Sequence, residues 1–270
     1  MLRNRQLTIP PTVMGKLKKH STIKYETRIV AFIDILGFKQ SVKKSTVNKK
    51  EFNRIFKTLT ELKEFFLEPK SEYTLKAEKE YGIDTQITQV SDSLIISRVI
   101  HEKGGVYSMI SDCSFAIHLL IEHGFLCRGA VKVGEMYHKD SILFGEAYLN
   151  AYDAEENERL PIIKFDKLLF DIVEFFPGDA NKGFEKWEVD FISKNCKPLM
   201  TGIYYIDYFT DYDDRVGGGE GSAYIHYSKL REIILNGLKI PKEQNAYEKY
   251  RWAADQFNLS VQRFGLECIQ

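Results

Sequence analysis

The chain contains 270 residues, of which 44% are hydrophobic and 28% are charged, and its formal net charge is zero. This composition is typical of a globular protein, and a neutral charge balance supplies no overall field that would attract nucleic acid or an anionic membrane. No apolar run reaches the ~18 residues that cross a bilayer, and the first residues lack the apolar segment of a signal peptide. We therefore expect a cytoplasmic protein with neither a membrane nor a nucleic acid as its partner.

The first 25 residues contain basic side chains and no acidic one, namely Arg3, Arg5, Lys16, Lys18, Lys19 and Lys24. They predict a solvated N-terminal arm over 1–25, with phosphate or partner binding as the alternative. Residues 28–35 then predict a buried strand, because five apolar residues lead into Asp34 and Gly37 follows three positions later. This strand would place Asp34 and a tight turn at the edge of a sheet.

A lysine-rich loop is expected next, followed by a helix of about four turns with a wide apolar face, because apolar residues recur at helical spacing from Phe52 to Phe66. Residues 84–91 alternate as a half-buried strand does, and residues 93–100 follow directly as a second strand. Asp92 would therefore lie at the tip of a hairpin.

The next part of the chain predicts a helix over 106–121 and a strand over 125–134. A turn after the glycine at the end of this strand would leave His138 exposed, and a short strand would follow it. Residues 146–158 predict an acidic helix, and a further strand begins at Pro161.

This order of strands and helices predicts an α+β fold with a ferredoxin-like, palm-type core, in which helices pack on one face of an antiparallel-rich sheet. We expect the core to span residues 26–165. A C-terminal extension over 166–270 would pack on this core and include a helix over 242–257.

Two carboxylates carry the chemistry that the sequence suggests. Asp34 and Asp92 would lie on adjacent strands beside a glycine turn, where they can hold divalent cations against a triphosphate. Each also has a purely structural explanation, since Asp34 can cap the following helix and Asp92 can close the hairpin turn. The acids of the helix at 146–158 are expected to form a solvated face, and Arg128 is expected to form a structural ion pair.

Three blocks of sequence, in this order, resemble the class III nucleotidyl cyclase catalytic domain. They are Phe-Ile-Asp-Ile-Leu-Gly-Phe at 32–38, Val-Ser-Asp-Ser-Leu-Ile-Ile at 90–96, and Arg-Gly-Ala-Val-Lys-Val-Gly at 128–134 followed by Phe-Gly-Glu-Ala-Tyr-Leu-Asn-Ala at 144–151. The resemblance covers roughly residues 28–165. It implies an enzyme that uses two Mg²⁺ or Mn²⁺ ions to convert a nucleoside triphosphate to a cyclic nucleotide and pyrophosphate, at the interface of a homodimer.

The resemblance implies metal ligands and a phosphate-binding turn at the end of the first strand. The ligands would be Asp34, Asp92 and the carbonyl of Ile35, and the backbone N–H groups of Leu36, Gly37 and Phe38 would surround the phosphates.

The chain departs from the family pattern at the helix that should carry an asparagine and a transition-state arginine. These positions correspond here to Leu149 and Asp153 or, after a shift of one residue, to Asn150 and Ala154. We expect Asn150 to contact the ribose, and replacement of the missing arginine is the alternative role for Arg128 beside the structural ion pair.

The lysine and aspartate with which the family selects purines correspond to Thr88 and Ile142. Thr88 or Gln86 could contact a pyrimidine edge instead, and the bacterial anti-phage cyclases that make cyclic pyrimidine nucleotides depart from the purine pattern in the same way. The alternative is a non-catalytic cyclase-like domain that binds a nucleotide or a protein partner.

Overall fold

The computed structural model describes residues 24–68, 71–178, 183, 185–210 and 220–270, so the arm predicted over 1–25 lies almost wholly outside the described residues. The elements in chain order are β1 (Glu26–Ile35), α1 (Phe38–Ser45), α2 (Lys49–Leu67), α3 (Glu72–Tyr81), β2 (Thr85–Val90), β3 (Ser93–Val99), α4 (Gly105–Glu122), β4 (Cys127–Lys139), β5 (Ile142–Gly145), α5 (Glu146–Glu156), β6 (Ile163–Asp166), α6 (Leu168–Phe175), α7 (Glu185–Asn195), β7 (Cys196–Met200), β8 (Ile203–Ile206), α9 (Glu220–Gly237), α10 (Asn245–Asn258) and the short 3₁₀ helix η2 (Val261–Phe264).

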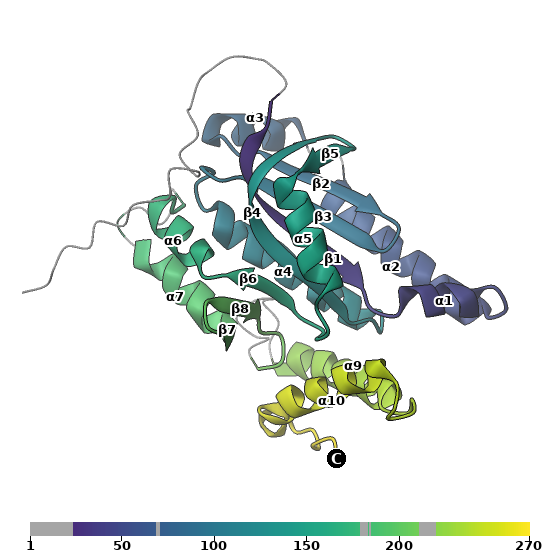
Figure 1. Cartoon of the computed structure of the whole chain (residues 1–270). Coiled ribbons are helices and arrows are strands. Elements are labelled where there is room, and N and C mark those ends of the chain that lie inside the picture. Colours follow the sequence, from purple (N-terminus) through teal and green to yellow (C-terminus); the bar gives the residue numbers. More distant parts are fainter. Residues whose placement is uncertain (1–23, 69–70, 179–182, 184, 211–219) are drawn as a thin grey trace, which may run out of the picture.

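One sheet organises the described part of the chain, with strand order β2-β3-β1-β4-β6-β8-β7 and with β5 paired to β4 (Figure 1). All neighbouring strands are antiparallel except β4 and β6, which are parallel. The predicted α+β fold with an antiparallel-rich sheet is therefore confirmed.

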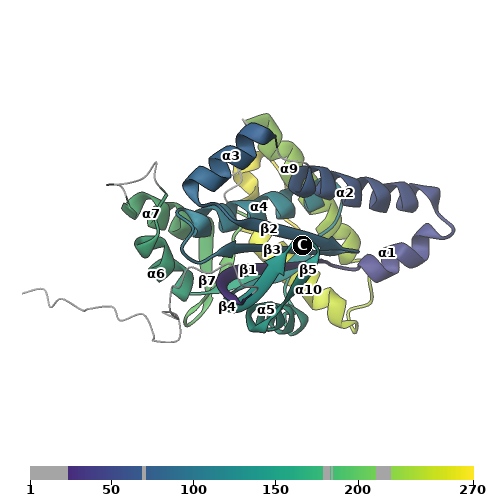
Figure 2. The ribbon, with the colours of Figure 1, turned by 90° about the horizontal axis from the view of Figure 1, so that it is seen from above.

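Helices cover both faces of this sheet. The middle of β1 is apolar from residue 29 to residue 33, and its successive side chains point to opposite sides. Ile29, Ala31 and Ile33 join the large core beneath α2 and α4, whereas Val30 and Phe32 pack with the buried alanines of α5. Figure 2 shows α5 on one side of the sheet and α2 and α4 on the other. The prediction of helices on one face alone is wrong, because a sheet with two apolar faces needs a cover on each.

The segment predicted as a lysine-rich loop contains helix α1. Phe38 and Ser41 give this helix a buried side, and the lysines lie on its solvent side. Asn48 then caps α2, since its side chain accepts hydrogen bonds from Lys50 N and Glu51 N. The predicted four-turn helix is confirmed as α2, but its apolar face is only partly covered. Its exposed aromatic residues are Phe52, Phe56 and Phe65.

The strand predicted to end at residue 134 continues to Lys139 as β4, and His138 is buried rather than exposed in a turn. Gly134 does not mark a turn. A Cβ atom there would lie 3.4 Å from the Cβ of Ala147 on α5, so the glycine allows the helix to lie close to the strand.

The residues after 166 add β8 and β7 to the sheet and supply, within the described residues, four further α-helices and the short helix η2. α9 packs against α4 and α10, and Figure 1 shows α9 and α10 together at one end of the molecule. The helix predicted over 242–257 is confirmed as α10. Within the described part of the chain, every helix is too short or too polar to span a lipid bilayer.

Candidate functional site

The candidate site begins with a row of three residues across adjacent strands. In the register of β3, β1 and β4, Asp34 lies opposite Ser93 on one side and Arg128 on the other. Residues directly opposite each other on antiparallel strands project to the same face, here the face covered by α5. The predicted adjacency of the two aspartate-bearing strands is confirmed, because Asp92 in the β2–β3 turn immediately precedes Ser93.

The Asp34 carboxylate lies in a partly buried, acidic environment. Burial, the charge of Asp92 and the charge of Glu155 raise the pKa of Asp34 to about 7, against the opposing effects of Ser93 and Arg128. Ser93 Oγ donates a hydrogen bond to Asp34 Oδ1 at 3.2 Å. The carboxyl group is therefore divided between its neutral and charged forms near neutral pH, and a cation held between the acids would favour the charged form.

Arg128 and Glu155 form an ion pair beside Asp34. Arg128 Nε contacts Glu155 Oε1, and Arg128 Nη1 donates to the carbonyl oxygen of Glu158 at 3.0 Å. The ion pair predicted for Arg128 is thus confirmed. Because Glu155 is 3% exposed and Glu158 is 8% exposed, the prediction of a wholly solvated acidic face is wrong at these two residues.

Glu155 was not among the predicted site residues, although the sequence contains a signal for it. Ala147, Ala151 and Glu155 recur at intervals of four residues, so they share one face of α5. The two alanines are fully buried, and Glu155 continues their line to the end of the helix.

The turn after β1 leads directly into α1. Gly37 has φ = 76°, a left-handed conformation that favours glycine, and its carbonyl oxygen accepts from Gln40 N and Ser41 N. Leu36 N donates to Leu126 O at 2.9 Å, so this N–H group is not available to a phosphate as the sequence had suggested. The N–H groups of Gly37 and Phe38 remain at the N-terminal end of α1. Ile35 ends β1 opposite Cys127.

The two residues predicted to contact a base lie on β2, away from the carboxylate pair. Thr88 is buried, donates to Asp140 O at 3.1 Å and lies 2.9 Å from His138 Nε2. Gln86 donates to Asp84 Oδ1 at 2.7 Å. Both side chains are therefore engaged within the protein.

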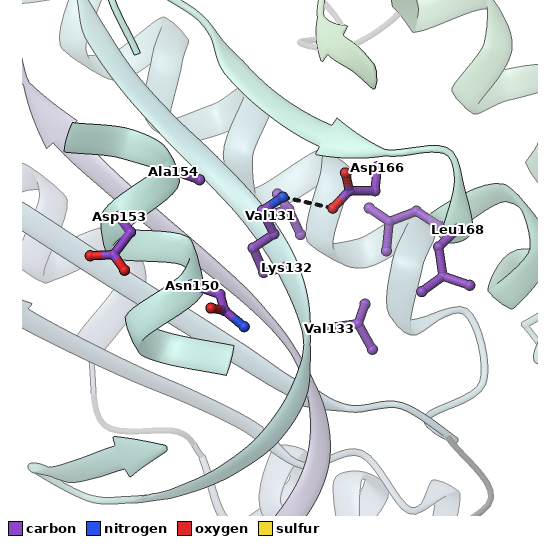
Figure 3. Close-up of a pocket in the computed structure, with 9 residues that line it drawn as sticks. Val131, Lys132, Val133, Asn150, Asp153, Ala154, Asp166 and Leu168 are labelled. Atoms are coloured by element: carbon purple, nitrogen blue, oxygen red, sulfur yellow. Dashed lines mark hydrogen bonds and ion pairs between the residues drawn. The ribbon is translucent and has the colours of Figure 1, made fainter. Parts of the chain in front are cut away.

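Asn150 lines a separate pocket of about 350 Å³ between α5, β4, β6 and α6. Figure 3 shows Lys132 and Asp166 joined by an ion pair on one side of this pocket, with Asn150 and Asp153 on α5 at the other side. The Lys132 Nζ–Asp166 Oδ2 distance is 2.8 Å. Asp34, Asp92 and Arg128 are not among the residues that line this pocket, so the pocket itself does not bring Asn150 together with the carboxylate pair.

Within the described ranges, no three His, Cys, Asp or Glu side chains converge closely enough to bind one metal ion without further ligands. The oxygen donors of Asp34 and Asp92 nevertheless fit Mg²⁺ or Mn²⁺, because such ions commonly use one or two carboxylates together with water and substrate phosphates. The raised pKa of Asp34 supports this fit, since burial and the nearby acids disfavour its negative charge and Arg128 offsets them only in part.

No protein-family model matches the chain, and no curated protein matches it in sequence. Solved structures of adenylyl and guanylyl cyclase catalytic domains are similar to it. The adenylyl cyclase CyaB from P. aeruginosa is 13% identical with a TM-score of 0.43, and the match covers 72% of this chain and 98% of that one. The guanylate cyclase domain of RhGC from Catenaria anguillulae in complex with GTP is 14% identical with a TM-score of 0.38, over 68% and 97% of the two chains.

The catalytic core of a rhodopsin-guanylyl cyclase with converted specificity, in complex with ATPαS, is likewise 14% identical with a TM-score of 0.40, over 68% of this chain and 96% of that one. At such low similarity, the functional reasoning depends on the residues of the site.

Proposed function

We propose that the protein is a metal-dependent nucleotidyl cyclase that converts a nucleoside triphosphate to a 3′,5′-cyclic nucleotide and pyrophosphate. The observation that carries this proposal is the position of Asp34 and Asp92 beside the Gly37 turn, where burial first and then the charge of Asp92 raise the pKa of Asp34. An acid pair of this kind is unfavourable without a counter-ion and is typical of a site that binds one.

The donor set of Asp34, Asp92 and the Ile35 carbonyl would hold the cations. Two divalent ions bound there would polarise the α-phosphate and neutralise the charge that develops on the leaving pyrophosphate. The N–H groups of Gly37 and Phe38 would bind phosphate oxygens at the start of α1.

Asn150 would contact the ribose from the second subunit of a homodimer. This assignment comes from the family resemblance, and it is supported by the distinct pocket that Asn150 lines on α5. Arg128 would contribute by orienting Glu155 and by offsetting the acidic charge near Asp34.

Pyrimidine triphosphates are the substrates we propose, and an anti-phage role follows from the resemblance to pyrimidine cyclases. The support is the absence of the purine-selecting charged pair at Thr88 and Ile142. A contact of Thr88 or Gln86 with a base would require the base to replace hydrogen bonds that these side chains make within the protein.

A non-catalytic nucleotide-binding domain is the second candidate. The ion pair of Arg128 with buried Glu155 favours it, because an arginine held in this way is not free to follow the charge of a transition state.

Turnover of the four triphosphates distinguishes these candidates. The pure protein is incubated with each triphosphate and Mn²⁺ or Mg²⁺, and the products are identified by mass spectrometry. We expect cyclic UMP or cyclic CMP at least as readily as the purine products, and loss of turnover in Asp34→Ala and Asp92→Ala. Asp190→Ala, at an exposed acid of α7, is the matched control.

Failure of all four triphosphates at high protein concentration would favour the non-catalytic candidate, and robust cyclic AMP synthesis without a pyrimidine product would contradict the proposed base preference.

A further inference from the structure

The C-terminal helix α10 presents a lysine to the charged cluster of the candidate site. Ala253, Ala254 and Phe257 of α10 are fully buried, and the ring of Trp252 packs against Phe209 with centroids 5.6 Å apart. Lys249 lies one turn before Ala253, so it shares the face of α10 that packs on the protein. The side chain is consequently half-buried and is held near the core rather than in open solvent.

Two of the three charged neighbours of Lys249, Arg128 and Glu155, are also neighbours of Asp34. Its pKa is lowered by burial and by Arg128, while Glu155 and Glu158 oppose this change. Arg128 and Glu155 also act on the pKa of Asp34. Figure 1 shows α5, which carries Glu155 near its end, running from β5 toward the end of the molecule where α9 and α10 lie.

The other two basic residues of this cluster have dedicated partners. Arg128 pairs with Glu155, and Lys164 Nζ lies 2.8 Å from Glu158 Oε2. No described residue, by contrast, forms a hydrogen bond or an ion pair with the ammonium group of Lys249. A partly desolvated cation without a close partner binds an anion more favourably than a solvated one does, because part of its hydration has already been removed.

We propose that Lys249 is an anion-binding residue of the Asp34–Asp92 site, contributed by α10, and that it binds the phosphate groups of a metal-bound nucleoside triphosphate. The identity of the ligand rests on the proposed function, whereas the anion site itself rests on the position of Lys249. The C-terminal helix is then part of the active site.

A purely structural role makes a different prediction. If Lys249 served only to balance Glu155 and Glu158, its removal would lower the melting temperature and leave anion affinity unchanged. If it binds phosphate, its removal would weaken binding of the triphosphate and of pyrophosphate in parallel, with little change in melting temperature.

The test is calorimetric titration of the full chain with UTP and, separately, with inorganic pyrophosphate, both in the presence of Mn²⁺. We expect Lys249→Met to weaken both affinities about tenfold or more, as loss of a charged hydrogen bond does. Lys249→Arg should restore most of the affinity, because it keeps the positive charge. Arg251→Met is the matched control, since Arg251 lies on the same helix in an exposed pair with Asp255.

Unchanged pyrophosphate and UTP affinity in Lys249→Met would overturn the proposal, as would failure of the wild-type protein to bind either probe. Should Lys249→Met not fold, Lys249→Gln provides the same comparison with a polar side chain. Binding that depends on Lys249, without turnover of any triphosphate, would leave the anion site in place and contradict the cyclase function. Turnover with the same kcat and KM in wild type and Lys249→Met would contradict the role of Lys249 and leave the cyclase function in place.

Discussion

Two polar groups lie on the same face of β1, at its opposite ends, and they differ in how fully they are paired. Near the start of the strand, Arg28 is fully buried, and its Nε donates to Ser97 Oγ at 2.9 Å. Ser97 Oγ and His138 Nδ1 are 2.9 Å apart, and His138 Nε2 lies 2.9 Å from Thr88 Oγ1. Thr88 in turn donates to the carbonyl of Asp140.

The directions of these hydrogen bonds are mutually consistent. Because Ser97 accepts from Arg28, its own proton is free to go to His138 Nδ1, and the neutral ring then donates from Nε2 to Thr88. Burial and the charge of Arg28 lower the pKa of His138 to about 4, which keeps the ring neutral.

At the other end of β1, the charges of Asp92 and Glu155 act on Asp34, and among the described residues Ser93 and Arg128 offset this repulsion only in part. The contrast teaches that burial of polar groups on this sheet does not by itself indicate function. A closed set of donors and acceptors stabilises the fold, whereas acids held together at the ends of neighbouring strands are a reason to look for a ligand.

Removing Arg28 should produce the largest change in stability. Arg28→Met leaves buried Ser97 and the partly exposed Asp84 without their cationic partner, and a buried polar group left unsatisfied typically costs about 1–3 kcal/mol. The free energy of unfolding from urea titration measures this. Asp34→Asn is the control at the other end of β1, and it should leave the stability unchanged or raise it. Equal losses in the two variants would contradict the contrast between the ends.

The pH dependence of stability should have opposite signs at the two ends. The pKa of Asp34 is raised from 3.8 to about 7, so the folded state holds more protons than the unfolded state between these values. The contribution of protonated Asp34 to the free energy of unfolding is therefore present at acidic pH, and it is lost as the pH rises through about 7. We expect Asp34→Asn to gain melting temperature relative to wild type as the pH rises from about 5 to about 8. A pH-independent difference in melting temperature between the two proteins would contradict this. Mn²⁺ should also raise the melting temperature of wild type more at the higher pH.

His138 should show the reverse behaviour. Its pKa is lowered from 6.5 to about 4, so the unfolded state binds more protons between these values, and stability falls as the pH drops through this range. His138→Asn should reduce this acid sensitivity, although it lowers stability at neutral pH by removing a hydrogen bond. Thermal melts between about pH 4 and pH 7 measure the slope. An unaltered slope in His138→Asn would argue against a buried neutral ring.

The smallest effect on stability should come from the turn after β1. Gly37 has φ = 76°, and no atom lies within 4 Å of a Cβ built there, so Gly37→Val carries mainly the cost of a left-handed backbone. That cost is of order 1–2 kcal/mol. We expect the binding free energy of Mn²⁺–triphosphate to weaken by more than the free energy of unfolding falls. The reason is that the valine side chain would lie beside the N–H groups at the start of α1. Gly82→Val, at a helix end with φ = 68° and equally open space, is the matched control for backbone strain. Equal losses of affinity and stability at Gly37 would favour a structural glycine.

The carboxylate pair could be predicted from the sequence because local patterns define it. The apolar run before Asp34 and the alternation on both sides of Asp92 determine two strand ends, and a short turn between β2 and β3 leaves little freedom in their pairing. Glu155 needed a less obvious signal, the four-residue spacing with Ala147 and Ala151.

Lys249 could not be assigned to the site from the sequence, because its position depends on how α10 packs against residues far away in the chain. His138 was misinterpreted for a different reason. A glycine in a strand can mark a turn or a close helix contact, and Gly134 serves the second purpose. The lysines near residue 44 suggested a loop, although they cover the solvent side of α1.

The central position of β1 has a consequence for how the chain is made. Among the described strands β1 is the first to be synthesised, but it lies between β3 and β4, and Thr27 bonds Glu135 across a sequence separation of 108 residues. At typical rates of synthesis, roughly 5–20 s pass before β4 emerges. During that interval one edge of a strand with two apolar faces has no partner. The nascent chain therefore needs protection from aggregation, and chaperones that bind extended apolar segments should recognise residues 29–35 first.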